Sequence, residues 1–245
     1  MCDIKTLVYC DLEATGLKNS GRPRITELSL VAVNTESILD LNALLISHLQ
    51  KNKLKVDRML PRVMNKLTIC VYPMATIRPE VSGITGLDNY NLSGQATFDS
   101  ETGQLLNIFL ERLPKPLCLV AHNGDSYDFP LLKAELEKAG VMLPYDTLCA
   151  DSYVGIKEIF KRSKDALQIQ NKLDFICIRN PTSYSLINLH KHLLGYSPIQ
   201  SHGAEVDCLA LIKTTAVLGI EWVNWVKENC QLFSKCTKMW SFQKC

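Results

Sequence analysis

The sequence carries almost no excess charge of either sign, since 27 Lys and Arg residues against 25 Asp and Glu residues leave a formal net charge of +2. A balance this even does not by itself indicate a polyanion partner, so any nucleic-acid binding must come from local patches of cations. The chain also lacks an apolar leader after Met1, and no apolar run approaches the length that crosses a bilayer. These absences predict a cytoplasmic or nuclear protein with no signal peptide, no transmembrane anchor and no membrane partner.

No C-x-x-C pair occurs among the ten cysteines. Several cysteines lie inside apolar runs, namely Cys10, Cys70, Cys118, Cys149 and Cys177. A free thiol in such a run behaves as a small hydrophobic side chain, so we expect reduced thiols and a reducing compartment. The C-terminal Cys230, Cys236 and Cys245 could be half of a zinc site, but their spacing matches no common zinc module and favours packed or idle thiols.

The composition is that of an ordinary globular protein, with 47% hydrophobic and 21% charged residues. A chain of 245 residues fits one α/β domain, which we expect over residues 1–245, with a core at about 5–228 and a C-terminal tail at 229–245. Strands are expected near residues 7–13, 25–33, 67–72, 117–121 and 146–151. Helices are expected over residues 100–113, 127–139, 153–163, 185–194, 204–218 and 220–228. This order predicts one mixed sheet with helices on both faces.

The segment 34–65 is the least readable part of the chain. Residues 38–49 satisfy both the helical and the strand period, so they predict either a strand or a short helix. The basic run over 51–66 fits a solvated surface loop somewhat better than a DNA-contacting arm.

The apolar run that opens the chain leads directly into Asp11 and Glu13 before Gly16 breaks the pattern. Side chains two apart in a strand point to the same face, so the two acids are expected side by side at the end of a buried strand. Two anions this close repel unless a cation lies between them, and a hard divalent ion such as Mg²⁺ is the simplest solution. For an isolated D-x-E, a strand end that turns into solvent is the commoner explanation, so further acids are needed.

Two further acids stand where helices are expected to begin. Asp128 lies in the first turn of the helix over 127–139, where the helix dipole favours a carboxylate. Asp207 lies in the first turns of the helix over 204–218, and His202 lies in the flexible Ser-His-Gly before it. Each of these residues alone is more often a helix-start or surface residue. Only their order along the chain, after Asp11 and Glu13, indicates an active site.

The ordered set D-x-E, H-N-G-x-x-Y-D-F-P and H-x-x-x-x-D resembles the motifs of the DEDDh 3′→5′ exonucleases. The longer stretches D-L-E-A-T-G-L, L-V-A-H-N-G-D-S-Y-D-F-P-L-L, S-Y-S-L and S-H-G-A-E-V-D-C-L-A-L are similar to the three-prime repair exonuclease (TREX) family. The likeness runs from about Leu7 to Leu218 and is weakest over 34–65. It implies an α/β, RNase H-like fold, with a mixed five-stranded sheet flanked by helices. It also implies a 3′→5′ exodeoxyribonuclease that releases mononucleotides from DNA 3′ ends and prefers single-stranded DNA.

The resemblance implies catalysis by two-metal-ion phosphodiester hydrolysis. The residues that would hold two Mg²⁺ ions per active site, with Mn²⁺ as a substitute, are Asp11, Glu13, Asp128 and Asp207. His202 would be the general base, because histidine titrates near neutrality and can accept the proton of the attacking water. The residues expected to contact the terminal nucleotides are Ala14, Leu17, Ile84, His122 and Tyr127. Such apolar contacts are indifferent to base identity, so little sequence preference is expected, and duplex ends must fray before they are cleaved.

The chain departs from the family at several positions. Ser126 stands where mammalian members carry Arg, and Pro181-Thr182 replace a basic pair, for which Lys172 and Arg179 are candidate substitutes. The Pro-rich segment of one branch and the C-terminal hydrophobic anchor are absent from the sequence. The family also implies a homodimer, formed by edge-strand pairing through the strand expected over 67–72.

Two other functions share these residues. Related DEDDh enzymes trim RNA 3′ ends, so a 3′ exoribonuclease is one alternative. A catalytically silent nucleic-acid-binding module is the other, although all five catalytic positions hold chemically competent residues.

Overall fold

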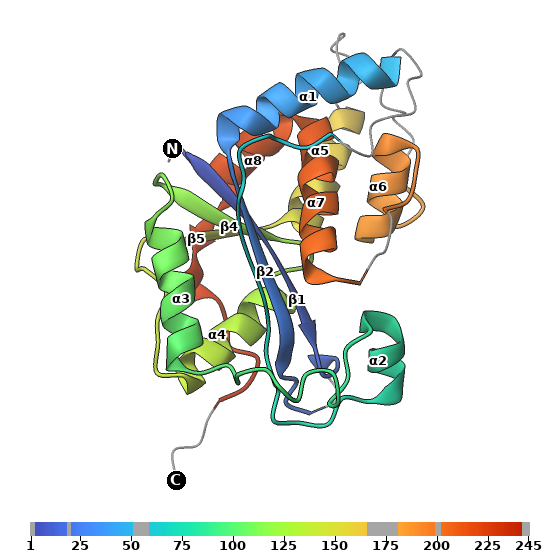
Figure 1. The fold of residues 1–245 in the computed structure, drawn as a ribbon. Coiled ribbons are helices and arrows are strands. Elements are labelled where there is room, and N and C mark those ends of the chain that lie inside the picture. The colour runs from blue at the N-terminus through green and yellow to red at the C-terminus, as the bar shows by residue number, and fades with distance from the viewer. Residues whose placement is uncertain (1–2, 19–20, 51–58, 166–180, 199–201, 242–245) are drawn as a thin grey trace.

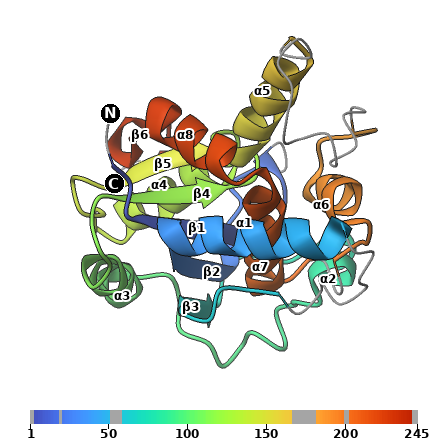
Figure 2. The ribbon, with the colours of Figure 1, turned by 90° about the horizontal axis from the view of Figure 1, so that it is seen from above.

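The structure, a computed structural model, describes residues 3–18, 21–50, 59–165, 181–198 and 202–241, and these residues form a six-stranded mixed sheet with helices on both faces (Figures 1 and 2). The strands are β1 (Thr6–Ala14), β2 (Ile25–Asn34), β3 (Asn65–Cys70), β4 (Leu117–Ala121), β5 (Leu148–Asp151) and β6 (Gln231–Leu232). The helices are α1 (Thr35–Gln50), α2 (Pro79–Thr85), α3 (Ser100–Glu111), α4 (Asp128–Lys138), α5 (Ser152–Asp165), α6 (Leu186–Leu194), α7 (Ala204–Leu218) and α8 (Ile220–Asn229), and a 3₁₀ turn covers Phe233–Lys235.

Strand β1 is the centre of the sheet, whose order is β3-β2-β1-β4-β5-β6. It pairs antiparallel with β2 along its whole length and parallel with β4 only as far as Tyr9 and Val120. Asp11 and Glu13 therefore lie beyond the last β4 pairing. Ligand sites of open α/β sheets usually lie at the carboxyl ends of the parallel strands, which here are β1, β4 and β5.

Side chains alternate along β1 and so enter two separate cores. Tyr9 faces α1 and the helices α5 to α8, among them the fully buried Trp222 and the nearly buried Trp225 of α8. Val8 and Cys10 face the other side, where α3, α4 and the segment after β6 cover the sheet. Both tryptophans are thus in the core.

The predicted mixed α/β fold is confirmed, with differences at its edges. Residues 35–50 form the helix α1, because Ile38, Leu41 and Leu45 form one buried face at helical spacing. Strand β3 begins at Asn65 and ends at Cys70, two residues earlier than predicted at each end. The two-residue strand β6 was not predicted, since its sequence is too short to show a period.

The cysteines of the described part of the chain are free thiols. Cys10, Cys118 and Cys149 are buried as predicted, Cys70 is half-buried, and Cys177 lies outside the described residues. Cys236 is buried against Cys149 with 3.3 Å between their sulfur atoms, and Cys230 is half-buried, so both pack rather than stand in solvent. Among the helices described, none combines the length and apolarity that a membrane span requires.

Candidate active site

The end of β1 presents two acids on one face, as the D-x-E spacing predicts. Asp11 lies opposite Ser29 of β2 and Glu13 lies opposite Glu27, and a bulge follows Glu13 in the hairpin. Both carboxylates are partly buried. Because β4 has already diverged at this point, the face on which they stand is open to residues from α4 and α7.

Helix α4 contributes Asp128, which is its first residue and is only 5% exposed. Its carboxylate accepts hydrogen bonds from its own backbone amide and from that of Leu12, which lies between Asp11 and Glu13 in the sequence. The bond to Leu12 couples the start of α4 directly to the end of β1.

Helix α7 contributes Asp207, and this completes an acidic cluster. One carboxylate oxygen each of Asp11, Glu13 and Asp207 lies within 4.8 Å of the others. Oxygen ligands of this charge and spacing suit a hard divalent cation. Asp128 is not one of these three ligand candidates, but its charge acts on Asp11, so it lies close behind them.

Burial is the main cause of the raised pKa of all four acids, and neighbouring negative charges raise it further. The pKa of Glu13 rises to about 7 through burial and the charges of Asp207 and Glu27. The pKa of Asp11 rises well above its ordinary range through burial and the charges of Asp128, Asp207 and others. Carboxylates that repel one another this strongly fit the binding of a divalent cation, which relieves the repulsion.

His202 is exposed and lies in the turn just before α7. Its backbone adopts the left-handed region, with φ 78°, which non-glycine residues seldom occupy. Its backbone amide donates to Asp207 Oδ2 at 3.2 Å, and its charge lowers the pKa of Asp207. The backbone of His202 is thus held next to Asp207, and the residue is exposed to solvent.

The residues predicted to contact substrate surround the same end of β1. Leu17, just after β1, is 75% exposed, and Ile84, in α2 on the side of the molecule where β1 ends, is 58% exposed (Figure 1). Large apolar side chains that stand in solvent are available to pack against a base. Ala14 is buried, with only 7% of its surface exposed.

His122 and Tyr127 have internal partners. The ring nitrogens of His122 lie 3.0 Å from Ser152 Oγ and 2.9 Å from the Tyr184 carbonyl oxygen, and burial lowers the pKa of the ring. The Tyr127 hydroxyl donates to the Gly16 carbonyl and so joins the start of α4 to the loop after β1. What these two side chains can offer a substrate is therefore a ring edge or face.

Sequence reasoning missed two acids that organise the site. Glu27 on β2 lies opposite Glu13, which only the register of the hairpin reveals. Asp151, at the end of β5, accepts from the amides of Asn123 and Asp125 and so holds the turn that precedes Asp128. Its place at the carboxyl end of a parallel strand is a signal that could have identified it.

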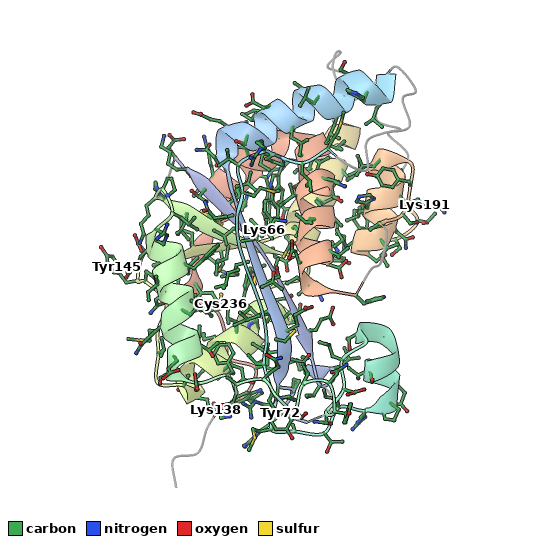
Figure 3. All side chains as sticks on the ribbon, in the orientation of Figure 1. Lys66, Tyr72, Lys138, Tyr145, Lys191 and Cys236 are labelled. Carbon is green, nitrogen blue, oxygen red and sulfur yellow. The ribbon has the colours of Figure 1, made fainter. Side chains whose placement is uncertain are left out.

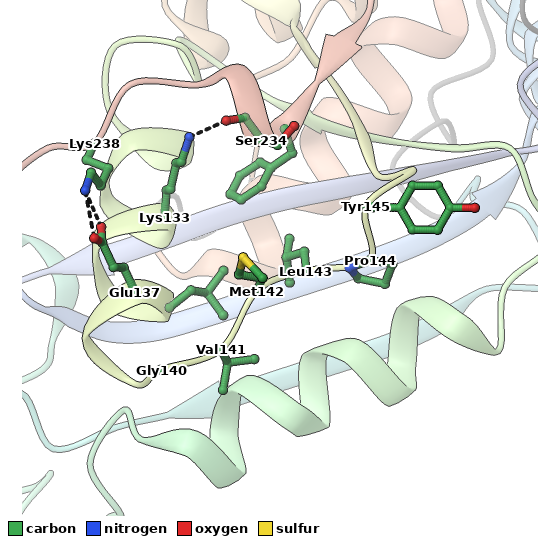
Figure 4. A pocket seen from close by; sticks show the side chains of 12 residues that line it. Lys133, Glu137, Gly140, Val141, Met142, Leu143, Pro144, Tyr145, Ser234 and Lys238 are labelled. Carbon is green, nitrogen blue, oxygen red and sulfur yellow. Dashed lines mark hydrogen bonds and ion pairs between the residues drawn. The ribbon is translucent and has the colours of Figure 1, made fainter.

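A cavity of about 690 Å³ lies elsewhere, between α4 and the segment after β6 (Figure 4). Its lining includes Met142, Leu143, Tyr145 and Phe233, with the ion pair between Lys238 and Glu137 at its edge. None of the predicted site residues lines it, so it is not the predicted active site.

Comparison with known proteins gives the family. Three-prime repair exonuclease 1 of Bos taurus is 37% identical to this chain over 240 residues, which covers 97% of the chain and 71% of the relative. Three prime repair exonuclease 2 of Mus musculus is 34% identical over 241 residues, which covers 96% of the chain and 93% of the relative. The chain belongs to the three-prime repair exonucleases. This membership confirms the predicted enzyme class, a 3′→5′ exonuclease, although no family model matches the chain.

Solved structures place this TREX chain in a wider fold group. A structure of exonuclease I matches with a TM-score of 0.65 at 13% sequence identity, covering 91% of this chain and 43% of that one. Exonuclease I of E. coli bound to a dT13 oligonucleotide matches with a TM-score of 0.62, also at 13% identity. The chain spans less than half of exonuclease I, and the likeness confirms the exonuclease fold.

Proposed function

We propose that this TREX chain is a Mg²⁺-dependent 3′→5′ exodeoxyribonuclease that releases mononucleotides from DNA 3′ ends and prefers single strands. The observation that carries the proposal is the cluster of Asp11, Glu13 and Asp207, whose carboxylate oxygens lie within 4.8 Å of one another. The cluster stands at the carboxyl end of the central strand, and Leu17, just after that strand, and Ile84 of α2 offer exposed apolar side chains that can hold the end of a nucleic-acid strand.

The acids would hold two Mg²⁺ ions, or Mn²⁺ in their place, and Asp128 would complete the set from α4. Bound together, two such ions activate a water and stabilise the charge that develops on the phosphate. His202 accepts the proton of the attacking water, for which its exposed position before α7 leaves access from solvent. The Asp207 carboxylate accepts a hydrogen bond from the His202 amide, and this bond keeps His202 next to the cluster.

The substrate end would lie between the loop after β1 and helix α2. Leu17 and Ile84 pack on the last bases from these two elements, while the backbone near Ala14 and the edges of His122 and Tyr127 confine the terminal sugar. Contacts of this kind do not read base identity. A frayed or single-stranded end fits them, and a paired end must open first.

A homodimer is proposed through β3, the edge strand of the sheet. A strand with one unpaired edge is a template for pairing with a second copy. The four β3 residues 66–69 alternate between exposed and half-buried positions, and the neighbouring Val63 is 72% exposed. Light scattering should give twice the monomer mass, and a proline substitution at Thr68 should reduce it to the monomer mass. A monomeric parent would overturn this proposal.

The free thiols of the described residues support a cytoplasmic or nuclear setting, because disulfides are rare in reducing compartments. Imaging of a fluorescent fusion, together with fractionation, tests the setting. Recovery of the protein in a secreted fraction would contradict it.

The substrate proposal is tested by matched oligonucleotides. A single-stranded DNA, the same sequence as RNA, and the DNA as a blunt duplex are digested with Mg²⁺ and with EDTA. We expect cleavage of the single-stranded DNA to be fastest, that of the duplex to be slower, and EDTA to stop both. Faster cleavage of the RNA would make the chain an exoribonuclease, and binding without cleavage of any substrate would make it a binding module.

A further inference from the structure

Helix α7 begins without a side chain of its own to cap it. Its N-cap residue is Gly203, and the first amides of a helix find no acceptor within that helix. The amide of Ala204, the first helical residue, donates instead to Glu27 Oε2 at 2.8 Å. A carboxylate from β2, 177 residues earlier in the chain, therefore caps the helix that carries Asp207.

Glu27 is a firmly placed acceptor. It pairs with Glu13 on β1 and with Cys70 on β3, so its backbone is held from both sides of β2. Its other carboxylate oxygen accepts from Cys70 Sγ at 3.8 Å. A second contact, from Cys208 Sγ to the Ser29 carbonyl at 3.6 Å, joins α7 to the same strand one turn further along. The start of α7 is thus held by the sheet in addition to the hydrogen bond that the His202 amide donates to Asp207.

Two predicted catalytic residues, His202 and Asp207, depend on the placement of the start of α7. The Ala204 amide lies between His202, with its left-handed backbone, and Asp207, whose own amide donates to the Gly203 carbonyl at 3.0 Å. The amide of His202 closes the turn onto Asp207 Oδ2. If Ala204 loses its acceptor, a buried amide is left unsatisfied and the turn that orients both side chains loosens.

Glu27 places a negative charge beside acids that already repel one another, and it contributes to the raised pKa of Glu13. A charge in that position costs stability when no cation is bound. It has a local benefit, because a carboxylate interacts favourably with the N-terminal end of a helix dipole and makes a stronger hydrogen bond to an amide than a neutral group does.

We propose that Glu27 is a positioning residue of the exonuclease site, which caps α7 from the sheet and thereby holds Asp207 and His202 in their working positions. The proposal rests on the proposed function of that site. Glu27 acts through the Ala204 amide and not as a ligand of the metal ions, since its two oxygens accept from Ala204 and Cys70. The group of oxygens within 4.8 Å consists of Asp11, Glu13 and Asp207.

Two substitutions that remove the charge of Glu27 separate its role as the cap of α7 from the effect of its charge on the cluster. Glu27→Gln keeps an oxygen that can accept from Ala204, whereas Glu27→Met has a similar length and no acceptor. Both variants relieve repulsion in the cluster, so both are expected to fold. Glu205→Gln is the control, because Glu205 lies in the same turn of α7 but faces Lys66 and Thr68 of β3 (Lys66 is labelled in Figure 3).

The measurements are kcat and KM on a single-stranded DNA oligonucleotide, the Mg²⁺ concentration for half-maximal rate, and hydrogen exchange of residues 203–207. We expect Glu27→Gln to keep kcat within about threefold and Glu27→Met to lose about a hundredfold, with KM little changed in both, since a misplacement of about 1 Å costs about this much. Exchange should accelerate only in Glu27→Met, and Glu205→Gln should match the parent.

Each other outcome overturns a defined part of the account. If Glu27→Met keeps the parental rate and exchange, Glu27 has no positioning role. If both variants lose activity equally and need more Mg²⁺, Glu27 acts through its charge on the metal site. The last outcome is that the parent does not cleave DNA, but hydrogen exchange is still faster in Glu27→Met than in Glu27→Gln. In that case the proposed function fails and the cap of α7 stands.

Discussion

Replacing Asp207 by Asn should change stability and activity in opposite directions. The substitution keeps the shape of the side chain and an oxygen that accepts from the His202 amide, and it removes one negative charge from the cluster. At the 4.8 Å limit that bounds the cluster, two unit charges repel by about 3 kcal/mol at an effective dielectric constant of about 20, and by about 1 kcal/mol in bulk water. Asp207 has two such neighbours, Asp11 and Glu13.

The net gain in stability is smaller than the sum of these repulsions, because the raised pKa values keep part of the cluster protonated at neutral pH. We expect a gain of about 1 to 3 kcal/mol in EDTA, which raises Tm by about 2–12 °C for a chain of this size. Hydrolysis with Mg²⁺ should fall by at least about a hundredfold, since the charge that helps to hold the ions is lost.

The assay is thermal unfolding of the parent and Asp207→Asn in EDTA and in Mg²⁺, with the exonuclease rate measured on the same samples. Mg²⁺ at a hundredfold excess over its Kd should stabilise the parent by up to about 3 kcal/mol and so raise its Tm. It should raise the Tm of Asp207→Asn much less. Glu205→Gln is the matched control. It also removes a carboxylate from the first turns of α7, but that carboxylate pairs with Lys66 and lies outside the cluster. The reasoning is refuted if Asp207→Asn lowers Tm in EDTA and responds to Mg²⁺ as the parent does.

Three further predictions concern substrate contact, the general base and pH. Leu17→Ala and Ile84→Ala should each raise KM for single-stranded DNA severalfold with Tm unchanged, because both side chains are exposed; an equal loss of Tm would show that they are structural. His202→Ala should lower kcat by at least about a hundredfold in Mg²⁺ while DNA binding, measured by anisotropy, survives; loss of binding instead would show that His202 supports the fold of the site. In EDTA, the free energy of unfolding should fall by about 2 kcal/mol as pH rises from 4.5 to 7. Burial and neighbouring carboxylates raise the pKa of Glu13 to about 7, so over this range only the folded state retains the Glu13 proton. A Tm that rises over this range in EDTA would contradict the raised pKa of Glu13.

The parts of the fold that could be predicted are those in which one local signal dominates. The wholly apolar 117–121 became the buried strand β4, and Gly140 and Gly195 follow α4 and α6 with the positive φ that their sequences indicate. Residues 38–49 could not be resolved, because a segment that satisfies two periods is decided by what it packs against. Here the packing is against α7 and β2, which selects the helix α1.

The same distinction holds in the site. Asp11 and Glu13 are close in sequence and their common face follows from the strand period alone. The approach of Asp128 and Asp207 depends on tertiary packing, and only the order of the motifs indicated it. Glu27 could not be found this way, because its partner Ala204 is fixed by the register of β2 and the position of α7, neither of which leaves a local pattern.

The role of the acidic cluster is decided by a time course on one single-stranded DNA oligonucleotide that carries either a 5′ or a 3′ fluorophore. The reaction is followed with Mg²⁺ and with EDTA, for the parent and for Asp207→Asn. We expect the 5′-labelled strand to shorten stepwise and the 3′ label to leave at once as a mononucleotide. We also expect EDTA and the substitution each to stop both reactions. A 5′ label released first, or stepwise shortening that continues in EDTA or in Asp207→Asn, would contradict the claim that this acidic cluster drives 3′→5′ hydrolysis.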